Sequence, residues 1–191
     1  MDEMDADGNV TGRTTTNDYG QADRYFVGSS LPWALGGFNL SMSYKNFDLS
    51  TLFNFAVGGK ILDTDYAGLV HGGLRPGQQA SVDVLDRWRN PGDITDVPRL
   101  HPDDRGSSRS TRFLFDNDFL RMRNVTFGYT IPTDVLNKTG FIKSFRVFVQ
   151  GDNLLTFSER EGLDPEQNVQ GTTNNRSAVF KTISAGVNMN F

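Results

Sequence analysis

The chain has 191 residues, of which 37% are hydrophobic, 12% are aromatic and 20 are glycine. A mean hydropathy of −0.44 leaves little material for a large soluble core, and this content of aromatics and glycine favours strands and turns over packed helices. The net charge of −4 excludes the basic surface of a nucleic-acid-binding protein. The absence of cysteine excludes disulfides and thiolate metal sites.

The first alternation of apolar and polar residues spans residues 37–45, and a second spans Phe47–Val57. A period of two predicts strands with one apolar face, and the short turn at residues 45–46 predicts a β-hairpin. The second strand has 11 residues, within the length of about 9 to 11 that a tilted strand needs to cross a bilayer.

Residues 58–110 are rich in Gly, Pro, Asp and Arg and show no sustained period, so we expect one large loop. The next strand begins near Phe119 and is stopped by Pro132. A phase slip at residues 123–124 within this strand predicts a β-bulge.

Residues 133–140 form a compact connection to a strand that opens at Phe145, where Phe148 lies on the otherwise polar side and leaves the facing ambiguous. A polar loop at residues 158–176 precedes the closing strand, residues 181–191. One face of the closing strand carries Ile183, Ala185, Val187, Met189 and Phe191.

Alternation alone also fits a half-buried sheet of a soluble β-sandwich. Here the polar faces are made of Asn, Ser, Thr and Gly instead of Lys, Glu and Arg, and the charges lie near strand ends. Short and long connections also alternate along the chain, as in outer-membrane barrels. The sequence therefore predicts an all-β fold, an antiparallel transmembrane β-barrel portion of about five strands with long extracellular loops.

Four ordered blocks carry a resemblance that covers nearly the whole chain. They are GGFN at 36–39 leading to YKNFDLS at 44–50, RWRNPGDITDVPR at 87–99, FLRMRNVTFGY at 119–129, and NLLTF at 153–157. Together they resemble the C-terminal end of a SusC/RagA-type TonB-dependent receptor. The N-terminus also lacks a secretory signal, so we expect a fragment: residues 1–35 as an extracellular loop segment, 36–191 as barrel strands and loops, and the plug domain absent from 1–191.

The resemblance implies a place in the cell outer membrane and TonB-dependent uptake of glycan or peptide nutrients through a barrel of about 22 strands. It also implies a SusD-like surface lipoprotein as partner of the long loops, and a TonB complex that contacts the absent N-terminal part. The expected substrate is an oligosaccharide or a peptide, with no enzymatic activity and no cofactor. Barrel strands that end on an aromatic residue address the assembly machinery, which makes the apolar stripe from Ile183 to Phe191 an expected assembly signal.

The family also often carries an Asp/Asn-rich, calcium-loop-like segment. Here Glu3, Asp5 and Asp7 match positions 1, 3 and 5 of a calcium loop, but Thr14 stands at position 12, where a carboxylate is needed. A calcium-like loop and a solvated acidic turn both remain open.

Other chemistry has weaker support. His71 and His101, near Asp103 and Asp104, offer a metal site in principle. An acid and base pair of a glycosidase could be drawn from Asp116, Asp118, Asp164 and Glu166, and sugars could stack on Trp33 or Trp88. The alternative functions are therefore a secreted carbohydrate-binding β-sandwich module and, behind it, a soluble glycosidase fragment.

Overall fold

The computed structural model describes residues 2–14, 16, 18–70, 77–100, 110–160, 162–166, 170–173, 175, 177 and 179–191. The chain divides into two units. Unit 1 comprises Met1–Gly28, Leu62–Leu114 and Thr172–Asn174, and unit 2 comprises Ser29–Ile61, Phe115–Gly171 and Asn175–Phe191. Within the described ranges, no helix has the length and apolar character that crossing a membrane requires.

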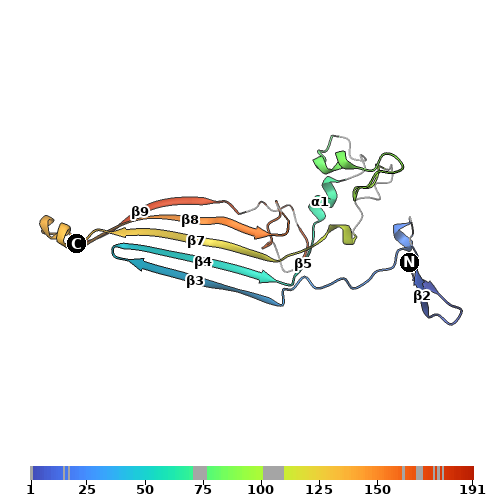
Figure 1. Ribbon diagram of the computed structural model, residues 1–191, viewed down its shortest axis with the longest axis horizontal. Coiled ribbons are helices and arrows are strands. Elements are labelled where there is room, and N and C mark those ends of the chain that lie inside the picture. Colours follow the sequence, from blue (N-terminus) through green and yellow to red (C-terminus); the bar gives the residue numbers. More distant parts are fainter. Residues whose placement is uncertain are drawn as a thin grey trace. The chain divides into compact units, whose positions relative to one another are not determined.

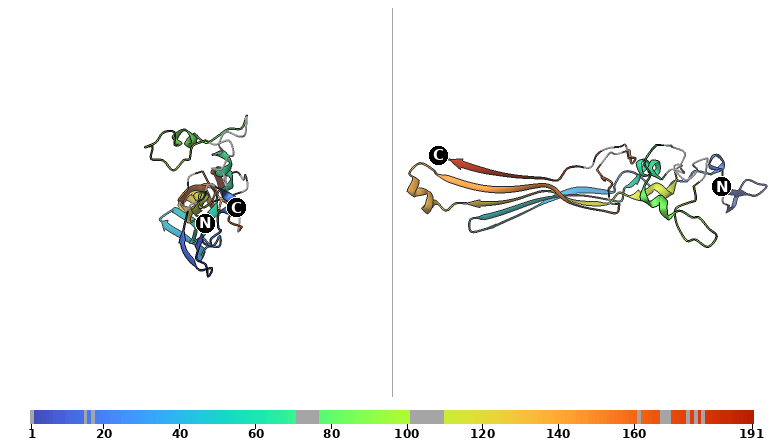
Figure 2. Two further views of the ribbon diagram at one scale, coloured as in Figure 1. Left: turned by 90° about the vertical axis from the view of Figure 1, so that its right-hand side faces the viewer. Right: turned by 90° about the horizontal axis from the view of Figure 1, so that it is seen from above.

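Unit 2 is dominated by a five-stranded antiparallel sheet with the order β3-β4-β7-β8-β9 (Figure 1). The strands twist relative to one another (Figure 2), and β3 and β9 form the two edges. The bounds of the strands are Ala34–Tyr44 for β3, Phe47–Val57 for β4, Phe119–Thr130 for β7, Ser144–Ser158 for β8 and Thr182–Asn190 for β9. The five strands expected from sequence are confirmed.

The two short connections lie at one end of this sheet, together with Phe191 (Figure 1). One is the β3–β4 turn, where Lys45 adopts a φ of 55°. The other joins β7 to β8 through α2 (Thr133–Leu136) and η5 (Asn137–Thr139). We call the end of the sheet with these two short connections the turn end. The opposite end, from which the long connections leave β4 and β8, is the loop end.

The register aligns the apolar residues of neighbouring strands into rows across the sheet. The middle row is Leu40, Thr51, Val125, Gly151 and Ile183. The expected bulge is confirmed, because Leu52 pairs with Asn124 whereas Phe53 pairs with Met122, which makes Arg123 the extra residue. The bulge keeps Met122 and Val125 on the same apolar face, although their spacing along the chain is odd.

Phe148 lies on the polar face of the sheet, between two glycines. It pairs with Gly128 on one side and Gly186 on the other. A Cβ atom at Gly186 would lie 2.6 Å from the phenyl ring. Phe148 therefore covers a glycine of the neighbouring strand instead of reversing the facing of β8, which explains the ambiguity in its sequence.

Unit 1 contains an N-terminal hairpin, β1 (Asp2–Met4) with β2 (Val10–Arg13), followed by η1 (Tyr19–Gln21). The segment expected as an irregular loop is partly ordered. It contains the short strand β5 (Lys60–Leu62), α1 (Thr64–Leu69) and η2 (Val82–Asp86). It is followed by η4 (Thr111–Phe113) and the short strand β6 (Leu114–Asp116).

A small core holds this segment together. Phe113 is fully buried against Ala67 and Val70, and Tyr66 packs edge-on to it at 6.0 Å between ring centroids. Asp63 caps α1 by accepting a hydrogen bond from the Tyr66 backbone N–H at 2.9 Å.

Candidate functional site

The apolar face of the five-stranded sheet is exposed. Met42 and Tyr44 are 62% and 71% exposed, and Ile183 is 76% exposed on the opposite edge strand. A water-soluble protein rarely leaves so continuous an apolar surface uncovered. The face therefore requires an apolar environment, such as lipid acyl chains.

Aromatic residues gather toward the two ends of this face. At the turn end, Tyr44, Phe47 and Tyr129 share one row, and the last two rings lie 4.7 Å apart. Toward the loop end, Phe38 stacks on Phe53 at 4.9 Å. The middle row between them consists of aliphatic and small residues. Aromatic bands on either side of an aliphatic belt are typical of strands that cross a bilayer.

The polar face carries an ion pair near the turn end. Arg146 on β8 reaches across β7 to Asp48 on β4, and its Nε atom donates to Asp48 Oδ1 at 2.9 Å. Arg146 passes directly over Gly128, where a Cβ atom would lie 2.3 Å from the guanidinium. Its guanidinium also lies 5.2 Å from the ring centroid of Phe148. Gly128 thus provides the space for an ion pair that joins three strands.

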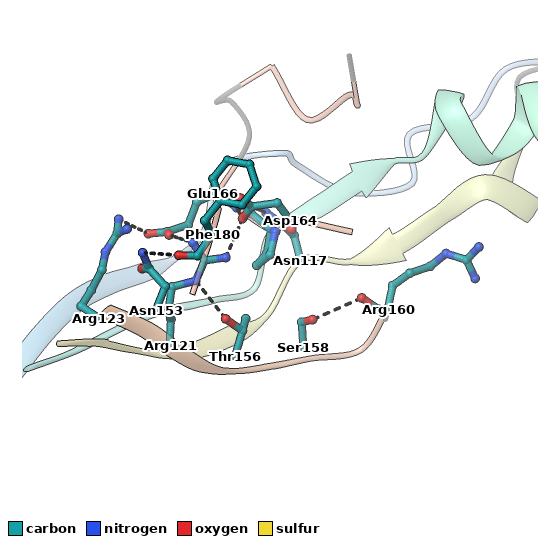
Figure 3. A network of polar contacts seen from close by, with 11 residues as sticks. Asn117, Arg121, Arg123, Asn153, Thr156, Ser158, Arg160, Asp164, Glu166 and Phe180 are labelled. Carbon is teal, nitrogen blue, oxygen red and sulfur yellow. Dashed lines mark hydrogen bonds and ion pairs between the residues drawn. The ribbon is translucent and has the colours of Figure 1, made fainter. Parts of the chain in front are cut away.

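A second polar cluster lies near the loop end (Figure 3). Arg121 on β7 is 2% exposed and donates to Asp164 at 2.6 Å and to Glu166 at 2.5 Å. Glu166 also accepts from Arg123 at 3.0 Å. We call these four residues the Arg121 cluster. The cluster fixes part of the β8–β9 connection, since both carboxylates belong to it.

The carboxylates considered for a glycosidase are engaged in structural contacts. Asp164 and Glu166 share one guanidinium. Asp118 accepts from the Gly58 backbone N–H at 2.6 Å. Asp116 pairs with Lys60 and, as hydrogen-bond acceptor, raises the pKa of that lysine. These contacts position loops and give no support to an acid and base pair.

Asp5 of the calcium-like loop holds the β1–β2 turn. Its carboxylate accepts from the backbone N–H groups of Asp7 and Asn9 at 3.0 and 2.8 Å. The hydrogen bonds from Asn9 lower the pKa of Asp5. Among the described residues, no group of three or more His, Asp or Glu has a metal-binding arrangement. Calcium binding by Glu3, Asp5 and Asp7 stays a prediction.

The remaining candidates divide into two groups. His71, His101, Asp103 and Asp104 lie outside the described residues. Trp33 is 78% exposed and lies over Gly58, where a Cβ atom would be 1.7 Å from the indole. Trp88 is half-buried, and its backbone N–H donates to Val97 O at 2.9 Å. Sugar stacking on either tryptophan stays a prediction.

The stripe of the closing strand lies on the apolar face, as its alternation predicts. Val187 and Phe191 are 61% and 66% exposed. Phe191 stacks on Phe141 at 6.3 Å between ring centroids. The sequence contained no signal for this contact, because Phe141 follows an irregular connection.

Comparison with known proteins identifies relatives of one kind. No protein-family model matches the chain. It is 35% identical over 181 residues to TonB-dependent receptor P3 of Formosa agariphila, covering 89% of this chain and 17% of the receptor. It is 34% identical over 153 residues to TonB-dependent receptor P39 of the same organism, covering 78% of this chain and 14% of that receptor.

Two solved structures of the RagAB peptide importer share the fold. The closed-closed state has a TM-score of 0.78 at 28% identity, and the open-open state has 0.76 at 25% identity. Each match covers 97% of this chain and 20% of the importer chain.

The sheet is therefore part of a membrane-spanning antiparallel β-barrel, with one face toward lipid and the other toward the lumen. The chain belongs to the SusC/RagA type of TonB-dependent outer-membrane receptors and spans about a fifth or less of the length of the relatives it matches. The resemblance, the fold class and the outer-membrane location expected from sequence are confirmed.

Proposed function

We propose that the chain forms a section of barrel wall in a receptor for TonB-dependent uptake of peptide or glycan fragments. The observation that carries the proposal is the two-sided sheet, with an aromatic-bordered apolar face opposite a polar one, in a chain similar to a peptide importer. Residues 1–35 would be an extracellular loop segment and residues 36–191 the C-terminal strands and loops. The chain has no catalytic role in this proposal.

The alternative, a secreted carbohydrate-binding β-sandwich, requires a second sheet packed on the apolar face. In the described part of the chain, that face is exposed. Uptake of labelled oligopeptides and oligosaccharides by cells that depend on the complete receptor tests the proposal. Uptake should stop when a protonophore collapses the proton gradient. Recovery of the receptor in the soluble fraction would contradict the proposal.

The orientation of the barrel gives a first prediction. Ile94 in the β4–β7 connection is 101% exposed and Val135 in α2 at the turn end is 54% exposed, and the chain has no cysteine of its own. Ile94→Cys should react with an impermeant maleimide on intact cells. Val135→Cys should react only after the outer membrane is permeabilised. The reverse pattern would invert the topology.

We also propose that the long loops bind a SusD-like surface lipoprotein, while TonB acts on a part of the receptor outside this chain. In unit 1, Val82, Leu85 and Ile94 are exposed apolar residues, with exposures of 75%, 65% and 101%. Exposed apolar side chains on an ordered loop are suited to a protein interface.

This interface gives a second prediction. Leu85→Asp should reduce co-purification of the lipoprotein with the complete receptor, because it places a charge in an apolar contact. The matched control is Asp86→Asn, an exposed neighbour in the same short helix, which should co-purify normally. Equal recovery of the lipoprotein with both variants would show that these apolar residues are not its contact.

Finally, we propose that Ile183, Ala185, Val187, Met189 and Phe191 form both the lipid-facing stripe of β9 and an assembly signal. The exposed stripe and the alternation that aligns its side chains support this proposal. Replacing Phe191 by Ser in the complete receptor should lower its outer-membrane level more than Phe141→Ala, which removes only the stacking partner. Equal effects of the two changes would reduce Phe191 to a packing role.

A further inference from the structure

Residues 162–166 of the β8–β9 connection fold back onto the polar face of the sheet. This segment supplies two carboxylates to Arg121, the third residue of β7. The Nε atom of Arg121 donates to Thr156 Oγ1 on β8 at 3.1 Å. All three donor nitrogens of the guanidinium therefore have partners, which fixes its plane.

Further contacts hold the same short segment. Arg123 donates to Glu166 at 3.0 Å, and the Asn117 side-chain amide donates to Pro165 O at 2.9 Å. Asp164 Oδ1 also accepts from the Glu166 backbone N–H at 3.1 Å. Asp164 is only 8% exposed. A connection held by so many charge-assisted contacts is restrained, unlike a loop that extends into solvent.

The side of the sheet that carries these contacts follows from the register. Leu120 and Met122 pair with Phe55 and Phe53 on the apolar face. Arg121 stands between them and therefore projects from the polar face. In the barrel proposed above, this polar face lines the lumen.

We propose that the Arg121 cluster is a latch that holds residues 162–166 of the β8–β9 connection inside the mouth of the barrel, where the segment narrows the lumen. This proposal rests on the proposed barrel orientation. The latch carries two positive and two negative side chains, so it narrows the lumen without adding net charge. Arg123 and Glu166 have side chains 36% and 22% exposed, which leaves this pair accessible to a passing polar solute.

The latch depends on Arg121 more than on any other member. Removing its guanidinium takes the cation away from the buried Asp164 and leaves Glu166 with Arg123 alone. A buried carboxylate without a cation is costly, so the segment should move toward water. Removing Arg146, a paired arginine of the polar face outside the Arg121 cluster, breaks the Asp48 pair at the turn end and leaves the latch intact. The two arginines form a matched pair for an experiment.

The test uses the complete receptor in cells with a single cysteine at Leu163→Cys and a bulky impermeant maleimide. The cysteine should react slowly in the parent and with Arg146→Met, and faster by about tenfold with Arg121→Met, because the segment is released. Fast labelling in the parent, or an unchanged slow rate with Arg121→Met, would overturn the latch.

A second variant distinguishes release of the segment from misfolding caused by Arg121→Met. Asp164→Asn with Glu166→Gln keeps Arg121 but removes both charges that hold it, and should also accelerate labelling of Leu163→Cys. Slow labelling in this correctly inserted double variant also overturns the latch. Heat-modifiable gel mobility of the same samples reports barrel insertion separately. Loss of insertion in the parent receptor would contradict the proposed function, whereas normal insertion with unaltered labelling contradicts only the latch.

Discussion

Ile183→Arg in the complete receptor is expected to prevent stable insertion into the outer membrane. Ile183 lies in the middle row of the apolar face, is 76% exposed and pairs with Gly151. A cation on the lipid face costs about 2 to 4 kcal/mol at the bilayer midplane. This cost is a large fraction of the stability of an ordinary domain, about 5 to 15 kcal/mol.

Two substitutions on the same strand provide the controls. Ser184 is the next residue and lies on the polar face opposite Gln150, so Ser184→Arg should insert almost normally. Val187 lies in the aromatic row of the turn end, near the interface, where the same cation costs about 0 to 1 kcal/mol. Val187→Arg should therefore fall between the other two variants.

Heat-modifiable gel mobility and the receptor level in isolated outer membranes measure this order. Equal levels of the Ile183→Arg and Ser184→Arg receptors would contradict the assignment of faces. Equal levels of the Ile183→Arg and Val187→Arg receptors would contradict the position of the sheet relative to the bilayer midplane.

The strands of the barrel could be predicted from sequence because their signal is local. Alternating residues share a face, so β4 was expected with the bounds that the structure shows, Phe47–Val57. The phase slip at Arg123 also appeared in the sequence, since a bulge leaves a two-residue break in the alternation. The facing of Phe148 was ambiguous because the residues that explain its position, Gly128 and Gly186, lie on neighbouring strands.

The ordered part of the long loop was not predictable in the same way. Its core brings Phe113 against Ala67 and Val70, which lie more than forty residues earlier in the sequence. The helix α1 has 6 residues, too few to display a helical period. The expectation of one irregular loop was therefore wrong for β5, α1 and η2, whereas residues 87–100 contain no helix or strand.

The two ion-pair clusters were likewise invisible in the sequence. Arg121 and Asp164 are 43 residues apart, and Arg146 and Asp48 are 98 residues apart. No spacing rule connects residues on different strands until the register is known. Of these charged residues, only Asp164 and Glu166 were considered from sequence, as candidates for catalysis, whereas the structure pairs them with arginines that hold a loop.

Gly128→Ala is expected to destabilise the barrel through Arg146. The added Cβ atom would lie 2.3 Å from the Arg146 guanidinium, which crosses Gly128 on its path to Asp48. The methyl group meets the flexible end of Arg146, which must move away from Asp48, so the expected cost is that of this partly exposed ion pair, about 0 to 1 kcal/mol. Because alanine has a higher strand propensity than glycine, a neutral site would give the opposite sign.

A double-mutant cycle tests this explanation. Arg146→Ala removes the guanidinium from above position 128, so the Gly128→Ala change should cost little in that background. The single change Arg146→Ala loses a partly exposed ion pair, worth about 0 to 1 kcal/mol. The unfolding temperature of the purified receptor, followed by heat-modifiable mobility, should therefore be nearly the same for Arg146→Ala and for the double variant. Costs that simply add would show that position 128 acts independently of Arg146, because residues in direct contact show a coupling of about 0.5 to 3 kcal/mol.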